Sequence, residues 1–233
     1  MTADQSPKQE QLTVTVLICV RDGANYLAEA VGSALAQTEQ PLEVLVIDDG
    51  SVDGSAAVGE AVGATVVRRP ALGLGAARNE GFQRARGALV VVLDADDLLL
   101  PHALAALREA VQAAPAAIGC VGRLVEFVSP ELVEHPAFKE LQVDTTARRS
   151  VLLSGGMWRR EVGLGLAFDT DLLTPDLDWI NQQRERHTLI SEIEPIVVRR
   201  RVHLHNMTRR ADVKASYLAV ARAAIARRRE GVT

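Results

Sequence analysis

The chain has 233 residues, of which 48% are hydrophobic and 24% charged, enough for the core of one α/β domain. Its formal net charge of −4 provides no overall basic field for binding nucleic acid. No apolar stretch reaches the ~18 residues of a membrane span, and the first twelve residues lack an apolar signal core. Both cysteines lie in apolar runs, so we expect a soluble, cytoplasmic protein with reduced thiols.

Strand and helix patterns alternate through the first half of the sequence. Apolar, β-rich runs predict strands at residues 13–20, 43–47, 64–68, 87–94 and 116–127. Helical patterns fill the intervals at residues 24–37, after Asp53, at 73–86 and at 101–113. This alternation predicts parallel βαβ units with right-handed crossovers.

The pattern weakens after residue 128, where we expect loops over a site, including one at residues 155–158. A short helix at 176–186 and a strand within 188–198 follow, and then an amphipathic helix at 210–229. Residues 199–230 carry ten Lys and Arg against two Asp and Glu. The predicted organisation is a disordered tail at 1–12, a domain at 13–208 with halves at 13–127 and 128–208, and a basic helix within 209–233.

Two acidic clusters follow predicted strands. Asp48 and Asp49 come after one strand, and Asp94, Asp96 and Asp97 come after another. Because the carboxyl ends of parallel strands meet at one edge of a sheet, the clusters should lie close together. Divalent cations such as Mg²⁺ and Mn²⁺ bind carboxylates together with substrate phosphates. This edge is therefore a candidate nucleotide and metal site, the alternative being that these acids only cap turns and helices.

Further candidates lie elsewhere in the chain. Arg78 follows a glycine-rich segment and could meet a base or a phosphate. Asp176 could act as a general base, and the Trp179 indole could cover the apolar face of a sugar, unless these residues only cap and pack a helix. His203 could complete a metal shell.

The order and spacing of these segments resemble the family-2 glycosyltransferases of the GT-A fold, which move a sugar from a nucleotide-diphosphate sugar to an acceptor. The segments that carry the resemblance are residues 14–38, 46–54, 75–81 and 93–97. It implies an α/β, Rossmann-like fold with a mixed, mainly parallel sheet flanked by helices. It also implies inverting transfer from a donor that is usually a UDP-sugar, with Mn²⁺ or Mg²⁺ as cofactor.

The resemblance implies a role for each site residue. Asp176 would be the catalytic base, with Asp178 as the second candidate, and Asp96 would bind the metal with His203 nearby. The expected nucleotide-binding residues are Val20, Arg21, Asp22, Asp48, Asp49, Arg78, Asp94 and Ala95. The expected residues for the acceptor and sugar are Gly156, Met157, Trp158 and Trp179.

Two departures from the family pattern keep other functions open. Pro175 stands where relatives often carry Glu, and Arg21 and Asp22 stand where relatives often carry an aromatic residue and Asn. The alternatives are a nucleotidyltransferase and a catalytically inactive sugar-nucleotide-binding module. The basic terminal helix could pack on the domain, form a homodimer or contact anionic lipid. The acceptor could be a saccharide, a lipid-linked molecule, a small molecule or a peptide.

Overall fold

The computed structural model describes residues 12–136, 138, 143–150, 153–206 and 211–230, so the predicted tail lies almost entirely outside the described residues. The strands are β1 (Val14–Val20), β2 (Glu43–Asp48), β3 (Thr65–Arg68), β4 (Leu89–Asp94), β5 (Leu98–Leu99), β6 (Gly119–Val128), β7 (Arg148–Arg149), β8 (Gly156–Arg159) and β9 (Ile190–Val202). The helices are α1 (Ala24–Leu35), α2 (Ser55–Ala61), α3 (Leu74–Arg84), α4 (Ala103–Ala113), α5 (Pro130–Val133), α6 (Arg160–Gly165), α7 (Pro175–Glu185) and α8 (Ala211–Glu230).

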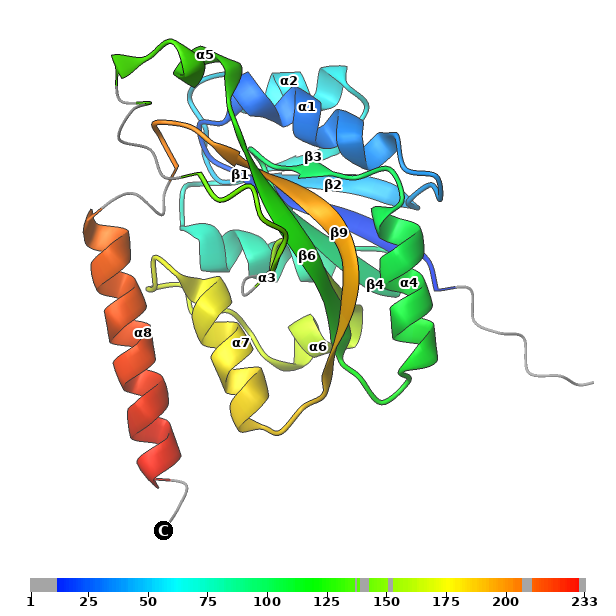
Figure 1. Cartoon of the computed structure of the whole chain (residues 1–233), viewed down its shortest axis with the longest axis vertical. Helices are drawn as coiled ribbons and strands as arrows, with labels where there is room; N and C mark the ends of the chain where they lie inside the picture. Colours follow the sequence, from blue (N-terminus) through cyan, green and yellow to red (C-terminus); the bar gives the residue numbers. More distant parts are fainter. Residues whose placement is uncertain (1–11, 137, 139–142, 151–152, 207–210, 231–233) are drawn as a thin grey trace, which may run out of the picture.

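The described strands form a single mixed sheet with helices on both faces (Figure 1). Its order is β3-β2-β1-β4-β8-β6-β9-β5, and β7 pairs with β6. Strands β1 to β4 are parallel, and the register places Cys19 beside Asp94 and Val20 beside Asp48. The two acidic clusters therefore lie on either side of the end of β1, as the sequence predicts.

Alternating side chains of the central strands supply two separate cores. Val16 and Ile18 of β1 face α1 and α4, whereas Leu17 and Cys19 face the core of α3 and α7. This burial of both faces explains why these strands are continuous apolar runs.

One expectation for the second half is wrong, and another is confirmed with a longer element. Residues 155–158 do not form an open loop, because β8 begins at Gly156 and runs antiparallel between β4 and β6. The strand expected within 188–198 continues to Val202, because β9 pairs with β6 along most of its length. The longer strand brings the residues after Val202 to the edge where β4 ends.

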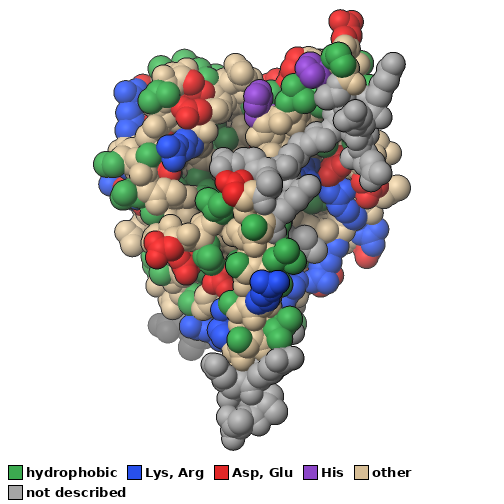
Figure 2. All heavy atoms as spheres, turned by 90° about the vertical axis from the view of Figure 1, so that its left-hand side faces the viewer, with side chains coloured by type: hydrophobic (Ala, Val, Ile, Leu, Met, Phe, Trp, Pro, Cys, Tyr) green, Lys and Arg blue, Asp and Glu red, His purple; other side chains and the backbone are tan. Residues whose placement is uncertain are grey.

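Helix α8 lies beside α7 at the side of the domain (Figure 1). Val213, Val220 and Ala224 are buried, whereas Leu218 and Ile225 are 61% and 51% exposed. Figure 2 faces this side of the molecule and shows hydrophobic and basic side chains beside one another along it. In the part of the chain that the structure describes, no helix is both long and apolar enough to span a membrane. Contact of α8 with lipid or with a second copy stays a prediction.

Candidate active site

The Asp49 carboxylate fixes the loop that leads into α3. Its two oxygens accept hydrogen bonds from the backbone N–H groups of Leu72 (3.0 Å) and Gly73 (2.9 Å). Arg69 lies 3.5 Å away, and Asp49 is 4% exposed. The neighbouring Asp48 is also buried and accepts a hydrogen bond from the backbone N–H of Ser51. Both acids thus shape the end of β2, and direct contact of Asp49 with a base stays a prediction.

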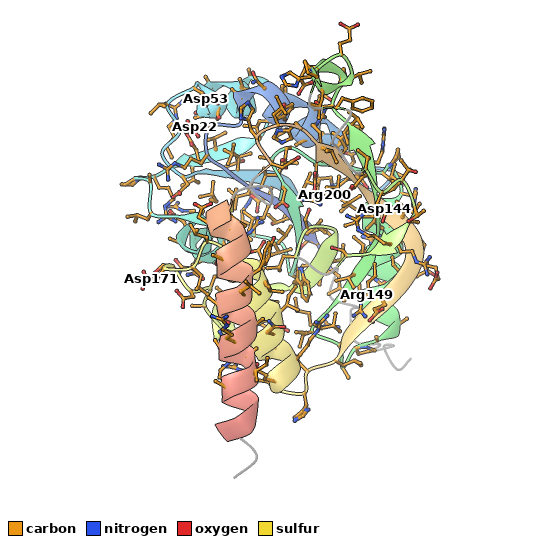
Figure 3. The ribbon with its side chains drawn as sticks, turned by 60° about the vertical axis from the view of Figure 1, so that its left-hand side comes forward. Asp22, Asp53, Asp144, Arg149, Asp171 and Arg200 are labelled. Atoms are coloured by element: carbon orange, nitrogen blue, oxygen red, sulfur yellow. The ribbon has the colours of Figure 1, made fainter. Side chains whose placement is uncertain are left out.

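The loop after β1 is tied to the loop after β2. Asp22 has a positive φ of 53° and accepts a hydrogen bond from the backbone N–H of Val52. Asp53 accepts one from the backbone N–H of Ala24, and Figure 3 shows Asp22 and Asp53 close together at this end of the sheet. Val20 is buried and Arg21 is exposed. Contact of Arg21 with a nucleotide stays a prediction.

Arg78 lies at the centre of the site and joins two of the predicted acids. Its side chain is fully buried, and Nη2 lies 2.9 Å from Asp94 Oδ1 and 3.2 Å from Asp176 Oδ2. Nε lies 3.4 Å from the other oxygen of Asp176. Burial alone would lower the pKa of Arg78, but the charges of Asp176 and Asp94 outweigh burial and raise it. Arg78 therefore stays charged and joins the end of β4 to the first turn of α7.

Asp176 reaches this position because of how α7 begins. Thr174 is the N-cap and Pro175 occupies the first helical turn, where the missing N–H of proline costs no helical hydrogen bond. Asp176 then lies in the first turn, where the helix dipole stabilises a negative charge. The departure at Pro175 is thus compatible with an acid directed into the site.

Asp96 forms the second part of the site, with residues that follow β9. Its Oδ2 lies 2.8 Å from His203 Nε2 and accepts a hydrogen bond from Asn206 Nδ2 at 3.2 Å. Asn206 Oδ1 accepts the backbone N–H of His203, which fixes the pair. Next to Asp96, Asp97 is buried and accepts the backbone N–H of Arg201.

The acids in this cluster repel one another. Partial desolvation by the surrounding protein raises the pKa of Asp94, and the charges of Asp96 and Asp176 act in the same direction against Arg78. Burial and the charge of Asp96 raise the pKa of Asp97 well above its ordinary value. Arg78 acts against this effect on Asp94, and Arg200 and the backbone N–H of Arg201 act against it on Asp97.

The side chains fit a hard divalent cation that is shared with a phosphate. Asp96 is partly exposed and has an imidazole beside it, and oxygen and nitrogen ligands of this kind suit Mg²⁺ and Mn²⁺. Within the described residues, no three His, Cys, Asp or Glu side chains are arranged to share a metal. The protein would therefore supply only one or two ligands, and the remainder would come from diphosphate and water.

Asp178 faces away from this cluster. Its carboxylate accepts hydrogen bonds from Gln182 Nε2 (2.8 Å) and from Arg227 Nη2 of α8 (3.1 Å). Arg227 Nε also donates to Glu185 Oε2 at 2.7 Å. Asp178 thus binds α8 to α7, and of the two predicted bases only Asp176 contacts Arg78.

The expected acceptor-binding residues lie in the core, which corrects that assignment. Met157 and Trp158 are fully buried and Trp179 is 1% exposed. The two indoles pack edge to face with ring centroids 5.2 Å apart, and Phe168 stacks on Trp179. Neither indole presents a face to a sugar, because Trp158 lies on the internal strand β8 and Trp179 of α7 packs against Trp158 and Phe168. Gly156 is also buried, and a Cβ there would lie 2.7 Å from Trp158 Nε1.

Sequence reasoning assigned no site role to three residues that the structure places near these acids. Ser154 Oγ accepts the backbone N–H of Asp94, and Ser216 Oγ of α8 lies 2.9 Å from Thr174 Oγ1. Tyr217 follows Ser216, and Asp94 and Asp176 both affect its pKa. In the sequence Tyr217 belongs to an amphipathic helix face, so no local signal indicated the site.

The profile of glycosyl transferase family 2 matches residues 15–157, which is more than half of the chain and includes β2 to β4 and all of β1 except Val14. The chain belongs to glycosyl transferase family 2. An uncharacterised glycosyltransferase of Nostoc is 28% identical over 174 residues, covering 70% of this chain and 52% of the relative. The succinoglycan biosynthesis protein ExoO of Rhizobium meliloti is 39% identical over 109 residues, covering 45% of this chain and 31% of the relative. The chain thus spans about half or less of these relatives.

Two solved structures share the fold. Residues 1–349 of TarS of S. aureus, in complex with UDP-GlcNAc, match with a TM-score of 0.69 and 17% identity, covering 90% of this chain and 65% of that fragment. The mannosyltransferase PcManGT of Pyrobaculum calidifontis, in complex with GDP-Man and Mn²⁺, gives a TM-score of 0.65 at 22% identity, covering 89% and 63%. The chain therefore has the expected GT-A fold.

Proposed function

We propose that this family-2 chain transfers a sugar, with inversion, from a nucleotide-diphosphate sugar to an acceptor hydroxyl, using UDP as the nucleotide and a divalent metal. The observation that carries the proposal is that Arg78 joins Asp94 to Asp176 at the sheet edge where Asp96 also lies. The structures of relatives in complex with UDP-GlcNAc, and with GDP-Man and Mn²⁺, support a donor of this chemistry.

Asp96 and His203 would hold the metal beside the diphosphate. The bound metal would neutralise charge on the leaving diphosphate. Asn206 keeps the Asp96 carboxylate in place through its hydrogen bond to Oδ2. Asp94, whose side chain is 40% exposed, is available to the ribose and the sugar while Arg78 holds its other side.

Asp176 would take the proton of the acceptor hydroxyl. Each carboxylate oxygen has two lone pairs, so the contacts with Arg78 leave acceptor capacity for a substrate O–H. The acceptor oxygen then forms a bond to the anomeric carbon while the bond from that carbon to the diphosphate oxygen breaks on the opposite face. Arg78 holds Asp176 and Asp94 in fixed relative positions, which favours a productive encounter.

Calorimetric titration with UDP, GDP and TDP, each with Mn²⁺ and with EDTA, tests the nucleotide and metal assignments together. Metal-dependent binding of UDP is the expected result. Metal-dependent binding without hydrolysis or transfer of any UDP-sugar would favour the inactive binding module. The absence of binding to all three nucleotides would contradict the proposal.

Asp176→Asn and Asp178→Asn form a matched pair on the same helix. We expect Asp176→Asn to lower kcat about 100-fold or more while UDP binding stays within about threefold, because a general base contributes ~10²–10⁴-fold. Asp178→Asn should retain most of the transfer activity, because Asp178 faces α8. Asp96→Asn should lose the metal-dependent part of UDP binding. Full activity in Asp176→Asn would move the base to another residue.

A further inference from the structure

Helix α8 is fixed against α7 at both ends of their contact. Near the N-terminal end of α8, Ser216 Oγ lies 2.9 Å from Thr174 Oγ1, two residues before Asp176. Toward its C-terminal end, Arg227 contacts both Asp178 and Glu185. Because Ser216 contacts the N-cap of α7, this end of α8 lies at the same end of α7 as the site.

Tyr217 lies on the face of α8 that is turned to the domain. Val213, Val220 and Ala224 are buried at helical spacing on either side of it, and Tyr217 itself is half-buried. Leu218, the next residue, is 61% exposed and points outward. The phenol of Tyr217 is therefore directed toward the protein, at the position along α8 where Ser216 meets α7.

Charged residues of the site act on the phenol of Tyr217, and the contact of Ser216 with Thr174 places this part of α8 at the end of α7 that carries Asp176. Burial raises the pKa of Tyr217, Arg200 acts in the opposite direction, and the carboxylates of Asp94 and Asp176 raise it further. Figure 3 shows Arg200 on β9 at the level of the upper end of α8.

We propose that Tyr217 contacts the sugar of the bound donor, so that α8 forms one wall of the sugar site. The inference rests on the proposed function, because it takes Asp94 and Asp176 as the residues beside the sugar and the acceptor. A phenol suits this position, since its ring can pack against the sugar while its O–H bonds a sugar hydroxyl. It would also supply the aromatic contact that the buried indoles of Trp158 and Trp179 cannot make.

The test compares the binding of UDP with that of a UDP-sugar, both in the presence of Mn²⁺. The sugar nucleotide is the one that the wild type binds most tightly among UDP-glucose, UDP-galactose and UDP-GlcNAc. Tyr217→Phe should weaken sugar-nucleotide binding about fivefold to tenfold, which corresponds to about 1.0–1.4 kcal/mol, and change UDP binding less than twofold, because one neutral hydrogen bond to the sugar is lost. Tyr217→Ala should weaken it further.

Leu218→Ala is the matched control, since the neighbouring residue points outward and both affinities should stay within twofold. If Tyr217→Phe lowered the affinities for UDP and for the UDP-sugar equally, the residue would only support the structure, which would overturn the proposal. Unchanged affinity for both would also overturn it. A wild-type chain that binds no nucleotide would instead contradict the proposed function. The two failures are therefore distinguishable.

Arg227→Gln tests whether the docking of α8 positions Tyr217. Loss of the contacts with Asp178 and Glu185 should speed hydrogen exchange in α8 and reproduce part of the Tyr217→Phe effect on the sugar nucleotide. Arg222→Gln, on the exposed side of the same helix, should change neither the hydrogen exchange of α8 nor the binding of the sugar nucleotide. Faster exchange in Arg227→Gln with unchanged sugar-nucleotide binding would contradict a sugar wall formed by α8.

Discussion

Arg78 Nη2 lies 3.2 Å from Asp176 Oδ2, although 98 residues separate the two in the chain. The same nitrogen lies 2.9 Å from Asp94, so one buried side chain of α3 fixes the end of β4 relative to α7. A guanidinium can do this because its donors lie in a rigid plane and face several acceptors at once. The sequence separation shows that the site forms only after the two halves of the domain have packed together.

Replacing Arg78 should affect both stability and function. In Arg78→Met, Asp94 and Asp176 lose their cation, and breaking a buried ion pair in this way costs about 3 kcal/mol or more. We expect urea unfolding to show this decrease in the free energy of unfolding, and we expect UDP to bind more weakly. Arg84→Met, on the same helix with a half-exposed pair to Glu80, should cost less than about 1 kcal/mol. Equal stability of the two variants would show that Arg78 does not hold these acids together.

The start of α3 requires a residue without a side chain at position 75. A Cβ on Gly75 would lie 2.1 Å from the backbone oxygen of Asp169, which cannot move as a flexible side chain could. We expect Gly75→Ala to lower the free energy of unfolding by about 2 kcal/mol and to reduce nucleotide binding by displacing Arg78. Gly32→Ala in α1, with no atom within 4 Å of the added Cβ, should instead stabilise the protein by about 0.5–1 kcal/mol. Chemical denaturation of both variants measures the contrast.

Much of the first half of the fold was predictable because local and global signals agree there. Each parallel strand is a continuous apolar run, and the acids that follow β2 and β4 meet at one edge in the register of β1. The second half was not predictable in the same way. Gly156, Met157 and Trp158 belong to an internal antiparallel strand, and a short apolar run after two glycines gives no indication of which strands it will join.

The residues of the site also differ in how far their positions could be predicted from the sequence. Asp94, Asp96 and Arg78 stand in motifs that are contiguous with predicted elements, whereas the direction of Asp178 depends on Arg227, 49 residues later. Tyr217 is on an ordinary amphipathic face until α8 is placed against α7. Periodicity identifies which face of a helix is buried, but it does not identify what that face covers.

The buried indoles give a fluorescence test of the corrected assignment. Trp158 and Trp179 are the only tryptophans of the chain, and each is at most 1% exposed. Acrylamide should therefore quench the folded protein far less than the urea-unfolded chain, and UDP-sugars should not change the quenching. Strong quenching that a UDP-sugar suppresses would show that an indole does lie in the sugar site.

Trp179→Ala should lower the free energy of unfolding by about 3–5 kcal/mol, because it opens a cavity beside Phe168.

Glu43 should stabilise the end of the sheet opposite the site in a pH-dependent manner. Burial alone would raise its pKa, but hydrogen bonds from the Arg86 backbone N–H (2.7 Å) and from Thr15 Oγ1 (2.8 Å), together with the Arg86 guanidinium, lower it below the ordinary 4.5. A lowered folded-state pKa contributes stability that is complete above the unfolded-state value and disappears as pH falls through the folded-state value.

Glu43→Gln should therefore cost about 2 kcal/mol at pH 7, as hydrogen bonds to a charged group do, and the difference from wild type should shrink as pH falls below about 4.5. Urea unfolding at a series of pH values measures it. Glu60→Gln, which removes a pair that is more than half exposed, should differ from wild type by less than about 1 kcal/mol throughout. A Glu43→Gln difference that stayed constant from pH 7 to pH 3 would mean that the charge of Glu43 is not what holds β2 to the Arg86 turn.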